Sequence, residues 1–199
     1  VQSALLEAMQ ERQVTIGPES FKLPEPFLVL ATQNPVEQEG TYPLPEAQLD
    51  RFMFKMSVGY PSRSDEDEIL ARRIERKKDA VEVETITDPA RVVAMQQAIE
   101  DVYVDPAVRM YMVEIVTQTR EHNQVLVGSS PRGSQALLKT SRAAAAMRGR
   151  DFVTPDDVKS IANLAIAHRL ILKPEHQIKG VNTEDIIKEI LRTVPVPTV

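Results

Sequence analysis

The sequence has no cysteine and only three histidines among its 199 residues. The lack of cysteine excludes disulfides and thiolate metal sites. The three histidines, His122, His168 and His176, are spread along the chain and none lies in an HExxH spacing, so we expect no metal site. No apolar run is long enough for a membrane span, and no signal peptide is recognisable. We therefore expect a soluble, cytoplasmic protein.

The chain also lacks an excess of basic charge. It carries 24 Lys and Arg against 29 Asp and Glu, a formal net charge of −5. Domains that bind nucleic acid usually gather basic residues on the surface that contacts phosphates. Residues 154–170 could be taken for a helix-turn-helix element, but they lack a basic, exposed recognition face. We therefore expect no nucleic-acid partner.

The first third of the chain has an α/β pattern. Residues 27–32 (FLVLAT) form a continuous apolar run between Pro26 and the sequence QNP, which is typical of a parallel strand buried on both faces. Residues 52–58 (FMFKMSV) predict a second strand, and residues 12–24, with Gly-Pro at their centre, predict a hairpin. Residues 1–12 begin inside an amphipathic helix without a cap, so we expect the front of a longer protein to be missing.

The rest of the chain predicts helices. Ser64 would cap a helix whose first turn is acidic and whose end is basic. Prolines just inside the start then predict helices from residues 89, 106, 131 and 155, and a last helix follows Thr183. The helix from residue 89 is expected to bury four side chains: Val92, Met95, Ile99 and Val102. The pattern indicates a piece of α/β sheet joined near residues 78–88 to a helical bundle.

Three polar residues break local rules. Asn34 follows the predicted strand 27–32, where ligands bind in open α/β sheets, although the sequence around it could be only a turn. Arg51 precedes a predicted strand; it could be a surface residue paired with Asp50 or Glu46. Arg132 lies in the first turn of a helix, where the dipole disfavours a cation. It either pairs with a distant carboxylate or helps the free N–H groups of the helix start to hold an anion such as phosphate.

Three sequence motifs resemble the MoxR family of AAA+ ATPases. They are VQSALLEAMQERQVT, FLVLATQNPVEQEGTYPLPEAQLDRF and SSPRGSQALL, in this order, and the resemblance covers essentially the whole chain. It implies the α/β remnant of a P-loop NTPase core at residues 1–78, followed by an all-α helical lid domain at 79–199. The hairpin resembles the insertion that such proteins carry just before the sensor 1 motif.

The resemblance also implies roles for the three residues. Asn34 matches sensor 1, which helps to place the water that attacks the γ-phosphate. Arg51 matches the arginine finger and would reach a nucleotide bound by a neighbouring subunit. Arg132 matches sensor 2 and would contact the γ-phosphate from the lid. Arginine fingers raise rates by roughly 10³–10⁵ in GTPase systems.

The phosphate-binding motif of the family is absent. None of the seven glycines opens a GxxxxGK[ST] loop, and no Asp-Glu pair follows an apolar strand before residue 27. ATP and Mg²⁺ would therefore be held mainly by motifs outside this chain. We expect this chain to be inactive on its own.

Two functions compete. In the first, the chain is the sensor and lid half of a chaperone-like ATPase that forms a ring, a hexamer by resemblance, and acts on client proteins with von Willebrand A-type domains. The alternative is a non-catalytic protein-interaction module derived from such an ATPase.

Overall fold

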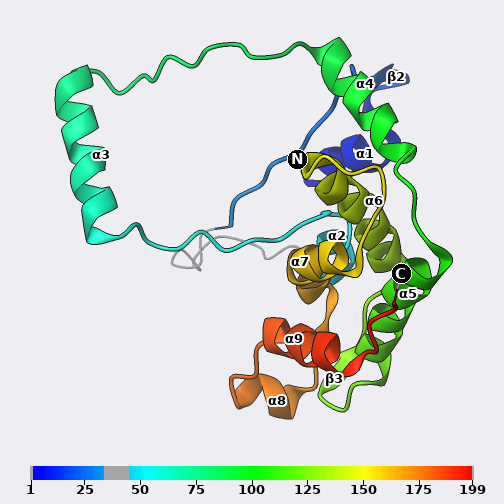
Figure 1. Cartoon of the computed structure of the whole chain (residues 1–199). Coiled ribbons are helices and arrows are strands. Elements are labelled where there is room, and N and C mark those ends of the chain that lie inside the picture. Colours follow the sequence, from blue (N-terminus) through cyan, green and yellow to red (C-terminus); the bar gives the residue numbers. More distant parts are fainter. Residues whose placement is uncertain (1, 34–44, 199) are drawn as a thin grey trace.

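The computed structural model describes residues 2–33 and 45–198. Most of its regular structure is helical (Figure 1). In chain order the elements are α1 (Gln2–Glu11), β1 (Gln13–Ile16), β2 (Glu19–Lys22), α2 (Glu46–Leu49), α3 (Arg63–Arg76), α4 (Pro89–Glu100), α5 (Pro106–Glu121), β3 (Val125–Val127), α6 (Pro131–Met147), α7 (Pro155–Ile166), the 3₁₀ turn η1 (Ala167–Arg169), β4 (Ile171–Leu172), α8 (Pro174–Ile178) and α9 (Thr183–Thr193).

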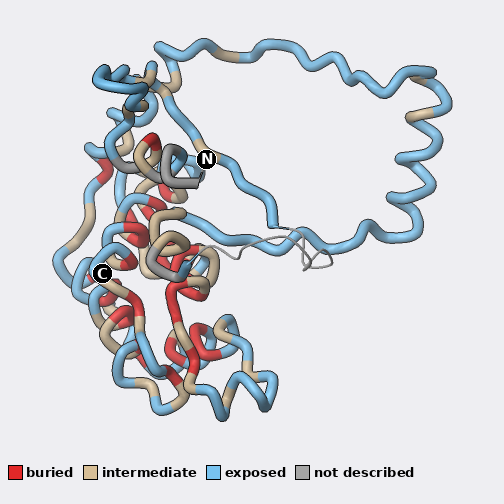
Figure 2. Tube along the Cα trace, turned by 180° about the vertical axis from the view of Figure 1, so that it is seen from behind, coloured by how far each residue is buried: buried red, intermediate tan, exposed pale blue. Residues whose placement is uncertain are grey.

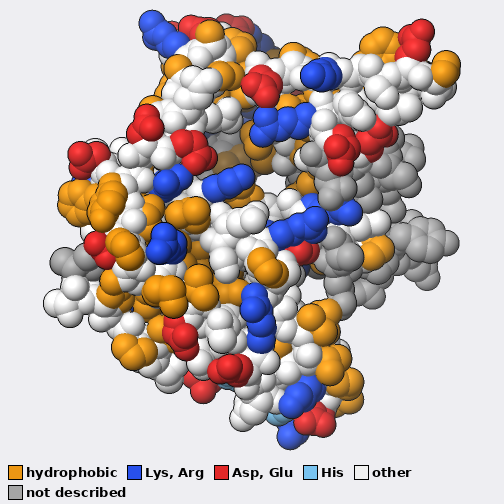
Figure 3. Space-filling view, turned by 90° about the vertical axis from the view of Figure 1, so that its right-hand side faces the viewer, with side chains coloured by type: hydrophobic (Ala, Val, Ile, Leu, Met, Phe, Trp, Pro, Cys, Tyr) orange, Lys and Arg blue, Asp and Glu red, His pale blue; other side chains and the backbone are white. Residues whose placement is uncertain are grey.

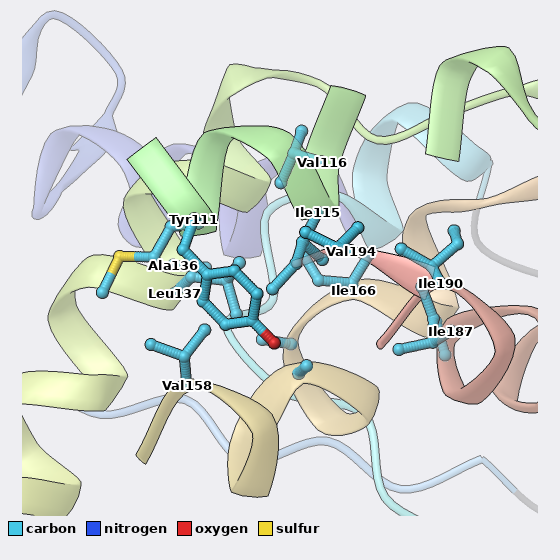
Figure 4. Packing of buried hydrophobic residues seen from close by; sticks show 14 of the residues in the cluster. Tyr111, Ile115, Val116, Ala136, Leu137, Val158, Ile166, Ile187, Ile190 and Val194 are labelled. Carbon is cyan, nitrogen blue, oxygen red and sulfur yellow. The ribbon is translucent and has the colours of Figure 1, made fainter. Parts of the chain in front are cut away.

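A single cluster of buried apolar side chains joins α5, α6, α7 and α9, and its members run from Val102 to Val194. Figure 4 shows Tyr111, Leu137 and Val158 in one part of the cluster and Ile187 beside Ile190 in another. Alanines on α6 and α7 let these two helices pack closely, since Ala145 and Ala162 are both fully buried. The buried residues lie in the helical body, whereas the long segment that leaves this body and carries α3 is exposed (Figure 2).

The hairpin expected in the first third is confirmed. Strands β1 and β2 pair antiparallel, and the turn between them uses Gly17 at a φ of 62°. A second small sheet, which the sequence did not predict, pairs β3 with β4.

The strands predicted at 27–32 and 52–58 are wrong for this structure, because both segments are irregular. Leu28 and Leu30 are 76% and 87% exposed, and Val58 is 89% exposed. A central strand of a parallel sheet needs a hydrogen-bonded neighbour on each side and helices over both faces. Within the described residues no such strands lie beside these segments, so their apolar side chains face solvent.

The predicted helix starts at 89, 106, 131, 155 and 183 are confirmed. Two details were wrong. The helix expected to be capped by Ser64 is α3, and its cap is Ser62, whose hydroxyl accepts a hydrogen bond from the amide of Asp65. Helix α4 buries less than expected: Met95 is exposed, and Val92 and Ile99 are only half-buried. The reason is that α4 packs mainly against α6 and lies at the edge of the body.

Candidate functional site

A polar hollow of about 210 Å³ lies where residues 50–53 meet the helical body. Four of its described lining residues are cationic and one is acidic. The lining consists of Met9, Asp50, Arg51, Met53, Arg132, Gln135, Ala136, Lys139 and Arg169. Positive charges that converge around one carboxylate make the hollow suitable for an anion.

The start of α6 forms one wall of this hollow. The hydroxyl of Ser130 accepts a hydrogen bond from the amide of Arg132 at 3.2 Å, as expected of a helix cap. The loop before it is fixed to the end of α5, because Arg120 Nε donates to the carbonyl of Ser129 at 2.8 Å and the amide of Ser129 donates to the hydroxyl of Thr119 at 3.0 Å. These bonds determine where the Arg132 side chain leaves the helix.

Asp50 is the acidic centre of the hollow. Its carboxylate accepts a hydrogen bond from the hydroxyl of Ser130 at 3.1 Å and lies 3.0 Å from Arg169 Nε. The contact with Arg132 Nη1 is longer, at 3.5 Å, and half of the Arg132 side chain is exposed. Asp50 therefore lies closer to the guanidinium group of Arg169 than to that of Arg132.

Arg169 reaches the same segment from the opposite wall. It lies at the end of η1, and its side chain is only 3% exposed. Burial lowers the pKa of Arg169, and the nearby Asp50 carboxylate offsets part of that effect. The guanidinium group remains charged, because its pKa starts far above neutrality. Burial, followed by the positive charge of Arg169, lowers the pKa of His168, so the neutral imidazole is favoured.

The structure brings together two of the three predicted site residues. Arg51 and Arg132 line the same hollow, whereas Asn34 lies outside the described residues. Of the two surface pairings considered for Arg51, the one with Asp50 does not form, because Asp50 contacts Arg132 and Arg169 instead. Nε and Nη1 of Arg51 are buried and have no hydrogen-bond partner among the described residues. The distant carboxylate considered for Arg132 is thus Asp50, 82 residues earlier in the chain.

Sequence reasoning missed Asp50 as the shared acid and missed both His168 and Arg169. A signal for the last two was present, because they interrupt the apolar run IANLAIAHRLIL. Polar or charged side chains inside such a run are buried only when they are paired.

Known proteins resemble both parts of the chain. Residues 1–54 match the model of the ATPase family associated with various cellular activities (AAA), and residues 117–190 match the AAA lid domain. The chain is 42% identical over its full length to the chaperone MoxR1 of Mycobacterium tuberculosis and 46% identical over 98% of its length to the uncharacterised protein YeaC of Bacillus subtilis.

The chain belongs to the MoxR family of AAA+ ATPases. It covers 54% of MoxR1 and 61% of YeaC, so it corresponds to only part of these relatives. The crystal structure of an ATPase candidate from Cytophaga hutchinsonii superposes on all of the MoxR-family chain with a TM-score of 0.93 and 42% identity, and the chain covers 62% of it. The fold is therefore a small AAA remnant with a helical AAA lid.

The described part of the chain offers no group of three or more His, Cys, Asp or Glu side chains that could hold a metal ion. Among the same residues, no helix combines the length and apolarity that crossing a bilayer requires.

Proposed function

We propose that this chain is the sensor and lid part of a longer MoxR-type protein that binds and hydrolyses ATP with Mg²⁺. The observation that carries the proposal is the hollow, which Arg51 and Arg132 line together with two further cations and one carboxylate. Phosphoryl transfer depends mainly on positioning and on neutralising charge on the transferred group. Guanidinium groups provide fixed, forked donors for phosphate oxygens.

In this proposal Arg51 is the arginine finger, Arg132 is sensor 2 and Asn34 is sensor 1. Arg51 and Arg132 line the same hollow, and in this proposal Arg51 reaches a nucleotide bound by the neighbouring subunit while Arg132 contacts a γ-phosphate from the lid. In the structure the Asp50 carboxylate lies 3.5 Å from Arg132 Nη1, which is a long distance for an ion pair. A phosphate oxygen would compete with this carboxylate for Arg132, so Arg132 could exchange its contact with Asp50 for one with phosphate.

We also assign the boundary between core remnant and lid to residues 78–79. The lid then contains all of the buried helical cluster, and the exposed segment around residues 78–88 connects the two parts.

The test of the proposal is Arg51→Ala in the full-length protein. Turnover should fall at least about a hundredfold, while nucleotide affinity stays nearly unchanged, because a finger acts on charge in the transition state. Arg109→Ala, which removes an exposed arginine of α5 away from the hollow, is the matched control and should keep wild-type turnover. Wild-type turnover in Arg51→Ala would contradict the role.

The trans action is tested by mixing. Rings that combine Arg51→Ala with subunits inactivated in their own acidic motif should regain part of the activity, because some interfaces then pair an intact site with an intact finger. If mixed rings form but show no activity at any ratio, Arg51 does not act in trans.

The same proposal includes a ring, a hexamer by family resemblance, and a chaperone-like role in maturing protein complexes, with client proteins that carry von Willebrand A-type domains. The name of MoxR1 as a chaperone supports this role. Sedimentation of the full-length protein with a slowly hydrolysed ATP analogue measures the ring size directly.

A further inference from the structure

Arg169 attaches the segment that carries Arg51 to the helical lid. We propose that Arg169 is a positioning residue: it holds the backbone on both sides of Arg51 against the end of α7, so that the lid and the arginine at position 51 move together. The inference rests on the role proposed above for Arg51. It concerns how that arginine is placed, not what it contacts.

The contacts of Arg169 surround position 51. Its Nη2 donates to the carbonyl of Asp50 at 3.2 Å and to the carbonyl of Phe52 at 2.9 Å. Its Nη1 lies 3.5 Å from the carbonyl of Met53, and its Nε lies 3.0 Å from the carboxylate of Asp50. One side chain therefore contacts the residue before Arg51 and the two residues after it.

Neighbouring contacts continue the attachment. His168 Nε2 lies 3.0 Å from the carbonyl of Phe52, and the amide of Lys55 donates to the carbonyl of Leu164 at 3.1 Å. Segment 50–55 thus lies along the end of α7 and η1. The exposed chain that follows, through α3, makes no comparable attachment among the described residues (Figure 1).

The chemistry of the attachment requires an arginine. A guanidinium group has five N–H donors in a rigid, planar fork, which can address several carbonyl oxygens and a carboxylate at once. A lysine would keep the positive charge, but it offers one compact ammonium group on a flexible chain. Arg169→Lys therefore tests the fork separately from the charge.

Because Arg169 belongs to the lid, a movement of the lid would also move the segment around Arg51. The other wall of the hollow is the start of α6, where Arg132 leaves the same lid domain. A lid movement that follows contact between Arg132 and phosphate would carry residues 50–53 with it. The nucleotide-sensing arginine and the finger are then coupled through α6, α7 and Arg169.

The experiment is a double-mutant cycle of Arg169→Lys and Arg51→Ala in the full-length protein. Arg169→Lys should lower kcat by about ten- to a hundredfold, because misplacement of a catalytic group by about 1 Å has an effect of this size. The KM for ATP should stay within about threefold. The double mutant should be no slower than Arg51→Ala, because a misplaced finger and an absent finger lose the same interaction.

Arg142→Lys is the matched control. Arg142 is also a lid arginine with a mostly buried side chain, and it pairs with Glu100 at 2.6 Å, outside the hollow. It should keep wild-type kcat. If Arg169→Lys keeps wild-type kcat, or slows the enzyme by the same factor in the Arg51→Ala background as in the wild type, the positioning role is overturned.

Hydrogen exchange gives a readout that does not depend on turnover. In Arg169→Lys, peptides covering residues 50–55 should lose protection, while peptides from α5 and α9 keep theirs. Unchanged protection at 50–55 overturns the inference. The two measurements separate the finger role of Arg51 from the positioning role of Arg169. Wild-type turnover in Arg51→Ala would remove the finger role, whereas the exchange pattern decides whether Arg169 holds the segment.

Discussion

At the scale of single residues, Arg132 occupies a position that its helix disfavours. The dipole of α6 places positive charge at the helix start, and the ion pair with Asp50 offsets this only at 3.5 Å and with half of the side chain exposed. Pairs of this kind contribute about 0–1 kcal/mol. The local geometry therefore gives Arg132 little structural role in the nucleotide-free protein.

Arg132→Gln should accordingly change the free energy of unfolding of the nucleotide-free, full-length protein by less than about 1 kcal/mol. The loss should appear with nucleotide, as a smaller thermal shift on adding a slowly hydrolysed ATP analogue. Denaturation curves with and without the analogue measure both quantities. A large loss of stability without nucleotide, together with an unchanged shift, would make Arg132 a structural residue and remove it from sensing.

Asp157 is a second residue with an unusual environment, because it is a fully buried carboxylate in the lid. Burial raises the pKa of Asp157, but hydrogen bonds from Arg150, from Thr154 and from Arg148 outweigh this and hold the pKa well below its usual value. These contacts join the end of α6 to the start of α7. Asp157 is therefore expected to stabilise the lid only while it is ionised.

Asp157→Asn should lower the free energy of unfolding by about 1–3 kcal/mol at neutral pH, because the buried carboxylate is the charged acceptor for Arg148, Arg150 and Thr154. In the wild type this stabilisation should be complete above a pH of about 4, the unfolded pKa, and should decline as the pH falls further toward the depressed folded pKa. Urea denaturation of both proteins between pH 7 and pH 3 measures it. A difference that stays constant over this range would contradict the assignment.

At the scale of elements, the connection from β3 to α6 depends on a glycine. A Cβ built on Gly128 would lie 2.6 Å from the backbone N and Cα of Arg120. No side-chain rotation relieves a contact with backbone atoms, so α5 and the loop would have to separate. The contact fixes the loop that leads to the cap of α6.

Gly128→Ala should therefore destabilise the lid by about 1–3 kcal/mol, the usual range for overpacking. Gly59→Ala is the control, since a Cβ there meets nothing within 4 Å, and it should be neutral or slightly stabilising. Thermal unfolding of the two variants gives the comparison. Equal melting temperatures would show that the close approach of the loop to α5 is readily relaxed.

The exposed apolar segments are the second feature at this scale. Residues 27–32 and 52–58 have the composition of buried strands but are irregular and mostly exposed. Figure 3 shows apolar side chains among charged ones on one face of the molecule. A strand forms only when its backbone finds partners, so composition alone does not make one. Residues 27–32 and 56–58 have no strand partner among the described residues.

At the scale of the whole molecule, the stabilising core belongs to the lid. All members of the main buried cluster lie between residues 102 and 194. A core that is contiguous in sequence and contained in about 100 residues is sufficient for an independent domain.

Residues 88–199 expressed alone should therefore unfold cooperatively, with a melting temperature within about 5 °C of the lid transition in the whole chain. Calorimetry of both proteins measures this difference. A non-cooperative transition in the shorter protein would show that residues 1–87 contribute to the core.

The whole chain should bind ATP with a Kd of about 1 mM or weaker, because the cationic hollow lacks a phosphate-binding loop to accompany it. Titration calorimetry with ATP and Mg²⁺ measures the affinity. Micromolar binding would contradict the view that the main phosphate contacts lie in other parts of the longer protein.

The sequence by itself determined the long helices of the lid, the hairpin and the family, but not the short helix α8. Helix starts are local: Ser130 and Thr154 each bond to amides two or three residues away, and a proline follows each of them. A β-hairpin is also local, since its turn brings the two strands together. The three motifs indicated the family because they are read as continuous stretches of sequence.

Only the tertiary structure decided which residues share the hollow. Arg169 contacts the carbonyl of Asp50 across 119 positions, and no periodicity in either segment encodes that contact. The tertiary structure likewise decided that residues 27–32 pair with no strand among the described residues, because a strand forms only beside a hydrogen-bonded neighbour. The contacts of Arg132 and Arg169 with Asp50 depend on how α6 and α7 pack, because this packing places the two arginines on opposite walls of the hollow around one carboxylate.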